Sequence, residues 1–149
     1  MIDRILLPTD GEEGATNATQ HAIELAAEHD AVLYVLYVVD ETTYSAYPGD
    51  EYVHEDEGLE AALEHAGRDA IDAVTERATA AGVETHGDVQ YGSPHDVIVD
   101  YADENDVDQI VMGSKQRSGE YRQLLGSVTD RVARLADRPV TIVKTAVEE

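Results

Sequence analysis

The sequence of 149 residues contains no cysteine, phenylalanine or tryptophan. Without cysteine the chain can form neither disulfides nor thiolate metal sites, and zinc-dependent base deamination, which needs cysteine ligands, is excluded. The six histidines contain no H-x-x-x-H or H-E-x-x-H pair, so the sequence predicts no metal site. No G-x-S-x-G turn occurs either, which leaves serine hydrolysis without a candidate nucleophile.

Long hydrophobic runs are also missing. The longest apolar run, Ala31–Val39, has nine residues, whereas a bilayer-spanning helix needs about 20. The N-terminus opens directly on a strand pattern at Met1-Ile2-Asp3, with no charged-then-apolar leader. We therefore expect a cytoplasmic protein with no membrane partner.

Basic residues are scarce: 10 Lys+Arg stand against 32 Asp+Glu, a net charge of −22, and only two of the ten are lysines. Such a surface repels nucleic acid and anionic membranes, so we expect no nucleic-acid partner. In multimolar salt the Debye length falls to about 3 Å or less and the self-repulsion is screened. The composition therefore suggests a halophile's cytosolic protein; the alternative is an acidic protein of an ordinary cytosol.

The hydrophobic pattern alternates between strands and helices. The length suits one domain over residues 1–149. Predicted strands are Ile2–Thr9, Ala31–Val39, Val83–Tyr91, Gln109–Met112 and Pro139–Lys144. Predicted helices are Thr16–His29, Leu59 to near Gly82, Pro94–Asn105 after an N-cap at Ser93, and Ser127 to about Ala136. This order implies an α/β fold, a doubly wound five-stranded parallel sheet with helices on both faces.

Two segments have a composition that indicates more than their element type. The segment Val83–Tyr91 alternates in polarity, as an edge strand does. The segment Thr42–Gly58 contains Pro48 and Gly49 and lies in a stretch with seven carboxylates between Glu41 and Glu60 and no basic residue. We expect that segment to be a solvated loop.

The most informative segment is a basic, glycine-punctuated loop between a strand end and a helix start. Three of the ten basic residues, Lys115, Arg117 and Arg122, fall in this loop, between Gly113 and Gly126. A helix start offers free N–H donors and a positive dipole end, which suit a bound phosphate. In doubly wound sheets the ligand crevice lies beyond the carboxyl ends of strands at the switch point. The loop matches neither the P-loop nor the dinucleotide glycine pattern, and the glycines could instead serve tight turns.

Other residues near these strand ends have two interpretations each. Asp10 could accept hydrogen bonds from ribose hydroxyls, or it could form an Asx turn before Gly11. Ser127 could cap the following helix or offer its hydroxyl to a phosphate. The backbone of Val38 and Val39 could flank an adenine ring, although buried strand ends commonly have this composition.

Several segments together resemble the universal stress protein family over essentially the whole chain. They are I-L-L-P-T-D-G (Ile5–Gly11), Y-V-V-D (Tyr37–Asp40), Y-G-S-P (Tyr91–Pro94), the glycine-rich stretch Met112–Val132 and R-P-V-T-I-V-K (Arg138–Lys144). The resemblance implies an adenine-nucleotide alpha-hydrolase-like fold that binds ATP (or AMP or ADP), with or without Mg²⁺ or Mn²⁺. It also implies a homodimer joined through the last strand, Pro139–Lys144.

Nucleotide-binding members of that family carry the motif G-x-x-G-x9-G-[ST]. Here Gly113, Gly126 and Ser127 occupy three positions of the motif, but Gln116 replaces the second glycine. The Gln116 side chain could crowd the phosphates, or its amide could donate to a phosphate oxygen. The nucleotide-binding residues implied by the resemblance are Pro8, Thr9, Asp10, Val39, Met112, Gly113, Lys115, Gln116, Arg117, Gly126, Ser127 and Val128.

Two functions of different classes fit these residues. One is an adenine-nucleotide-binding stress-response protein that acts as a dimeric signalling or regulatory module. The other is a family member that binds no nucleotide and acts as a protein–protein interaction module. A slow ATPase is a weaker third alternative, because no general base is identifiable beyond Asp10, and we assign no catalytic residue.

The charge generates a prediction about stability. The free energy of unfolding should rise as KCl is added, most steeply below about 1 M, where the Debye length is still shortening. Denaturant unfolding across a KCl series measures this dependence. A free energy of unfolding that stays constant or falls with salt would contradict the halophilic interpretation.

Overall fold

The computed structural model describes residues 2–9, 16–40, 53–113 and 127–144. Their elements in chain order are β1 (Arg4–Pro8), α1 (Thr16–His29), β2 (Val32–Asp40), α3 (Val53–Ala80), β3 (Thr85–Gly92), α4 (Pro94–Glu104), β4 (Gln109–Gly113), α5 (Ser127–Leu135) and β5 (Val140–Val143). The five strands form one sheet in the order β3-β2-β1-β4-β5, and every pair of neighbours is parallel. The predicted fold class is confirmed, and β3 is the edge strand that its alternating pattern predicts.

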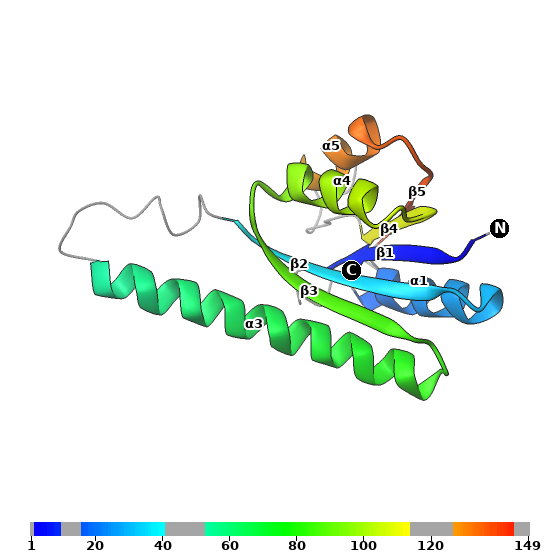
Figure 1. Ribbon diagram of the computed structural model, residues 1–149, viewed down its shortest axis with the longest axis horizontal. Coiled ribbons are helices and arrows are strands. Elements are labelled where there is room, and N and C mark those ends of the chain that lie inside the picture. Colours follow the sequence, from blue (N-terminus) through cyan, green and yellow to red (C-terminus); the bar gives the residue numbers. More distant parts are fainter. Residues whose placement is uncertain (1, 10–15, 41–52, 114–126, 145–149) are drawn as a thin grey trace, which may run out of the picture.

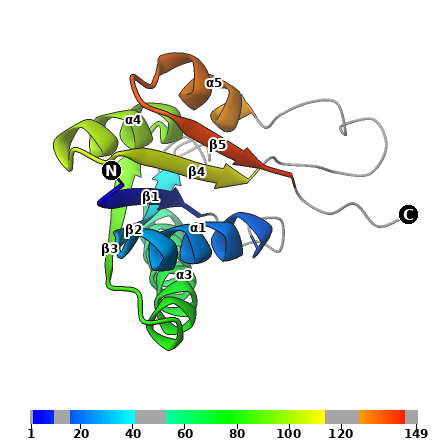
Figure 2. The ribbon, with the colours of Figure 1, turned by 90° about the vertical axis from the view of Figure 1, so that its right-hand side faces the viewer.

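Two hydrophobic clusters lie on opposite faces of the sheet. Helices α1 and α3 cover one face, and α4 and α5 cover the other (Figures 1 and 2). The central strand β1 contributes to both, because Ile5 and Leu7 belong to the first cluster and Leu6 to the second. All three side chains are 0% exposed. The near-continuous apolar sequence of β1 therefore reflects burial on both of its faces.

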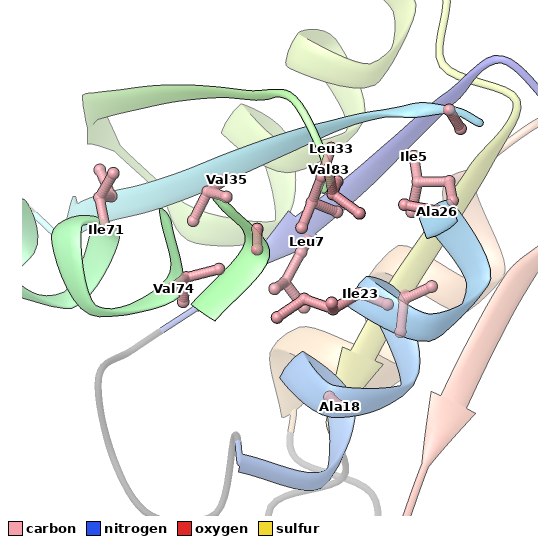
Figure 3. Packing of buried hydrophobic residues seen from close by; sticks show 14 residues of the cluster. Ile5, Leu7, Ala18, Ile23, Ala26, Leu33, Val35, Ile71, Val74 and Val83 are labelled. Atoms are coloured by element: carbon pink, nitrogen blue, oxygen red, sulfur yellow. The ribbon is translucent and has the colours of Figure 1, made fainter. Parts of the chain in front are cut away.

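The cluster under α1 and α3 depends on small side chains in α1. Ala18, Ala22 and Ala26 recur every four residues and are buried, so they form one face of the helix against the sheet. Figure 3 shows Ile23 of α1 near Leu7, and Ile71 and Val74 of α3 on the side of Val35. Alanines at these positions let the backbone of α1 lie close to the strands.

Helix α3 begins earlier than the sequence predicts. The sequence predicts a loop over Thr42–Gly58; residues 42–52 lie outside the described residues, and from Val53 onward the chain is helical and extends past the carboxyl end of β2 (Figure 1). The first turns, V-H-E-D-E, are rich in carboxylates; acidic residues are favoured near a helix N-terminus, and glutamate is a good helix former. Neither α3 nor any other helix in the described ranges is both long and apolar enough to cross a membrane.

Helix α4 begins where the sequence predicts. Ser93 occupies the N-cap position, Pro94 is the first helical residue, and Asp96 lies in the first turn. The Ser93 side chain makes no capping hydrogen bond; its Oγ lies 3.4 Å from His95 Nδ1. The first turn is closed by the backbone instead, since Val97 N donates to Ser93 O at 2.9 Å.

Arg138 ties the other end of α4 to the last strand. Its Nη1 donates to the carbonyls of Ala102 and Val107, each at 2.8 Å, and its Nη2 donates to Asp103 Oδ1 at 2.6 Å. The carbonyl groups at a helix C-terminus lack partners within the helix, and a guanidinium satisfies them with charge-assisted hydrogen bonds. One of the few cations thus holds together α4, the start of β4 and the approach to β5.

Gly67 in α3 lies against an aromatic ring of the sheet. A Cβ atom at Gly67 would lie 2.5 Å from Cδ1 and 2.9 Å from Cγ of Tyr37 in β2. Real Cβ atoms do not approach carbon atoms this closely, so a side chain at this position would displace the ring or the helix. Gly58, in the same helix, has no atom within 4 Å of the corresponding position.

This difference makes the two glycines a matched pair. Gly67→Ala should lower the free energy of unfolding by about 1–2 kcal/mol, because overpacking against Tyr37 outweighs the gain in helix propensity. Gly58→Ala should raise it by up to about 1 kcal/mol through propensity alone. Urea unfolding of both variants measures these effects, and an equal gain in both would contradict the packing assigned to Gly67.

Candidate functional site

The carboxyl ends of β1 and β4 meet where the chain reverses its direction across the sheet. From β1 the chain adds β2 and then β3 on one side, and β4 and β5 lie on the other. A crevice outside the carboxyl ends of the strands at such a switch point is the usual ligand site of doubly wound sheets. The residues at these ends are Pro8 and Thr9 after β1, and Met112 and Gly113 in β4.

Pro8 limits the hydrogen bonding between these two strands. Thr9 N donates to Leu36 O of β2 at 2.8 Å, and successive N–H groups of a strand point to opposite sides, so the nitrogen of Pro8 faces β4. A proline nitrogen has no hydrogen to donate. The ladder between β1 and β4 accordingly joins Ile5 with Gln109 and Leu6 with Ile110. Within the described residues, it stops short of the carboxyl ends at the switch point.

A buried threonine links the end of β4 to the start of α5. Thr129 lies in the first turn of α5 and is 5% exposed, and its Oγ1 donates to Gly113 O at 3.1 Å. One turn later, Val132 is fully buried in the cluster beneath α4 and α5. Gly113 and the start of α5 are therefore held at the same end of the sheet, as Figure 2 shows for β4 and α5.

The end of β2 lies beside the end of β1 and is apolar and buried at Val39. Val39 is 1% exposed and is in register with Tyr91 of β3, and Asp40 is in register with Gly92. Gly92 has φ 142°, a conformation that side chains rarely adopt. It lets the chain turn directly from β3 into α4 at this end of the sheet.

Tyr91 connects this end of the sheet to α3. Its hydroxyl donates to Glu64 Oε1, and Arg68 Nε lies 3.6 Å from Glu64 Oε2. The hydrogen bond from Tyr91, with a smaller contribution from Arg68, holds the pKa of Glu64 below its usual range. Glu64 therefore stays ionised and fixes the position of the Tyr91 ring next to the carboxyl end of β2.

The structure places part of the sequence-predicted site. Seven of its residues lie at the carboxyl ends of β1, β2 and β4 or at the start of α5: Pro8, Thr9, Val39, Met112, Gly113, Ser127 and Val128. The other five, Asp10, Lys115, Gln116, Arg117 and Gly126, lie outside the described residues. Because β2, β1 and β4 are adjacent in the sheet, the described residues share one end of it.

Sequence reasoning missed Thr129. The pattern S-V-T-D indicated only a helix start, and a threonine in a first turn is ordinarily a surface or capping residue. The available sequence signal was its spacing of three residues from the apolar Val132, which places both on one face of the helix. Its acceptor, 16 residues earlier in the chain, has no local signature.

At the ends of β1 and β4 the side chains are proline, threonine, methionine and glycine, none of which titrates near neutral pH. A ligand there would contact backbone groups and apolar surface. In the part of the chain that the structure describes, no three His, Asp or Glu side chains come together to hold a metal ion.

These features define a doubly wound α/β protein whose candidate ligand site lies at its topological switch point. The chain belongs to the universal stress protein family, whose model matches residues 1–144. This confirms the resemblance that the sequence motifs indicate.

Individual relatives match along almost the whole chain. Universal stress protein MJ0531 of Methanocaldococcus jannaschii is 36% identical over 152 residues, which cover 100% of this chain and 86% of the relative. The solved structure of MJ0577, from the same organism, has a TM-score of 0.85 at 27% identity and covers 99% of each chain. A universal stress protein solved in complex with cAMP has a TM-score of 0.68 at 29% identity, covering 97% of this chain and 98% of the other.

Proposed function

We propose that this protein binds an adenine nucleotide (ATP, AMP or ADP) at the carboxyl ends of β1, β2 and β4, and acts as a cytoplasmic regulatory module in a stress response. The phosphates would lie over the segment from Gly113 to the start of α5. The adenine and ribose would lie toward the ends of β1 and β2. Asp10 is the proposed partner of the ribose hydroxyls, and Lys115 and Arg117 are the proposed cations near the phosphates.

The observation that carries this proposal is the position of Gly113 and α5. Gly113 ends β4 at the switch point, and the first turn of α5 is bonded to it through Thr129. The first N–H groups of a helix have no partner within the helix and favour anions. The cAMP complex of a relative supports an adenine nucleotide as the ligand class.

The described residues are compatible with such a ligand. Val39 and Met112 are apolar residues at strand ends on either side of β1, and an adenine ring requires apolar surface together with backbone donors and acceptors. When bound, ATP would bring its own negative charge, and Mg²⁺ or Mn²⁺ is proposed as a counter-ion of its phosphates. The protein's part is to orient the nucleotide.

Titration calorimetry in high-salt buffer tests the proposal. ATP, with and without Mg²⁺ or Mn²⁺, should bind saturably to the wild-type protein. Gly126→Val should abolish binding, because a branched side chain at the last motif glycine would obstruct the approach of phosphate to backbone amides. Gly58→Ala, a glycine change in α3 away from the motif, is the control and should leave the affinity unchanged.

The alternative function is an interaction module that binds no nucleotide. Gln116, in place of the second motif glycine, favours this alternative because its side chain could crowd the phosphates. If ATP shows no saturable binding at any salt concentration, the interaction module becomes the better hypothesis. A Gln116→Gly variant that then gains ATP binding would locate the cause at this position.

We further propose a homodimer joined through β5. Among the strands that the structure describes, β5 lies at the edge of the sheet and pairs only with β4. Its sequence V-T-I-V is more apolar than a free edge tolerates, because an exposed edge offers unpaired backbone groups to another chain. Within the described residues, Val140 and Val143 pack against the two clusters, whereas Ile142 joins neither.

Light scattering in multimolar salt measures the assembly. The wild-type protein should have the mass of a dimer, and Ile142→Lys should shift it toward the monomer by placing a charge in the proposed interface. Arg134→Lys on the exposed face of α5 is the control and should remain dimeric. A monomer mass for the wild-type protein would rule out the β5 interface.

A further inference from the structure

We infer that Thr129 is a positioning residue through which the site selects phosphorylated nucleotides over the bare nucleoside. This inference rests on the proposed function, because it concerns the same site. It assigns Thr129 no contact with the ligand. Its role is to hold the start of α5 against the end of β4 through one hydrogen bond.

The hydroxyl of Thr129 donates its hydrogen bond to Gly113 O. Thr129 and Thr19 are the buried polar residues of the described chain, and a buried hydroxyl requires a partner. A threonine within a helix commonly bonds the carbonyl four residues earlier. Thr129 Oγ1 instead donates to Gly113 O, 16 residues away, so the bond joins two elements rather than one helical turn.

The bond sets the position of the first turn of α5 relative to β4. On the side of the strand, Gly113 is in register with Val143 of β5, so its backbone is held within the sheet. On the side of the helix, Val132 is fully buried one turn after Thr129. The β-branched Thr129 side chain has few rotamers. Its hydrogen bond to Gly113 therefore restricts the position of the first turn of α5, which would face the phosphates.

Other parts of the proposed site do not depend on this bond. The ends of β1 and β2 are held by their own ladder, which pairs all five residues of β1 with β2 and continues to Thr9 N and Leu36 O. Adenine and ribose contacts at those ends should survive the loss of the Thr129 hydroxyl. Contacts to phosphate at the start of α5 should weaken, because their geometry would no longer be fixed.

Two variants of Thr129 test this inference. Thr129→Val keeps the shape of the side chain and removes the hydroxyl, and Thr129→Ser keeps the hydroxyl. Dissociation constants for ATP, AMP and adenosine are measured by displacement of a fluorescent ATP analogue in high-salt buffer, at a temperature where thermal unfolding shows each variant to be folded. Thr129→Val should bind ATP about fivefold more weakly, because the start of α5 is no longer held in place before the ligand binds. The loss of affinity in Thr129→Val should be smaller for AMP than for ATP, and the affinity for adenosine should change by less than about twofold. Thr129→Ser should bind ATP with the affinity of the wild-type protein.

The outcomes distinguish the inference from the proposed function. If the wild-type protein binds no ATP, the proposed function fails and the inference with it. If the wild-type protein binds ATP, the proposed function stands, and the inference is overturned by any of three results for the variants. These are unchanged ATP affinity in Thr129→Val, an equal loss for ATP and for the less phosphorylated ligands, and failure of Thr129→Ser to restore affinity.

Discussion

The burial of β1 on both faces is the constraint on which the rest of the structure depends. Ile5 and Leu7 require cover from α1 and α3, and Leu6 requires cover from the opposite side. A strand with two apolar faces is stable only inside a sheet with helices on both sides, so the chain must place neighbours on either edge of β1. That requirement produces the reversal between β1 and β4, and the reversal determines where a ligand can bind.

The architecture at the carboxyl end of the sheet, where the proposed site lies, depends mainly on backbone geometry. Pro8 removes a donor at the end of β1, and Gly92 permits a turn that other residues would resist. Gly113 offers its carbonyl to Thr129. Such a site can keep its architecture while the side chains around it vary, which is compatible with 27% identity to MJ0577 at a TM-score of 0.85.

The few basic residues fall into two groups, one with a structural role and one with a proposed role in binding. Arg138 satisfies carbonyls of α4 and of the segment between α4 and β4, and it pairs with Asp103 at the amino end of the sheet. In contrast, Lys115 and Arg117 belong to the motif segment that follows the carboxyl end of β4. In a chain with a net charge of −22, attraction for an anion has to be local and short-ranged, because the surrounding carboxylates oppose it at longer distance.

The sequence by itself determined the order of the elements and the class of the sheet, because apolar periodicity and glycine or proline punctuation are local signals. It failed at the start of α3, where carboxylates that indicated a loop instead form helical turns. Only the tertiary structure decided the bond from Thr129 to Gly113 and the side of the strand that the Pro8 nitrogen faces. Both depend on which elements become neighbours after folding, and no local pattern of residues encodes a partner 16 residues away.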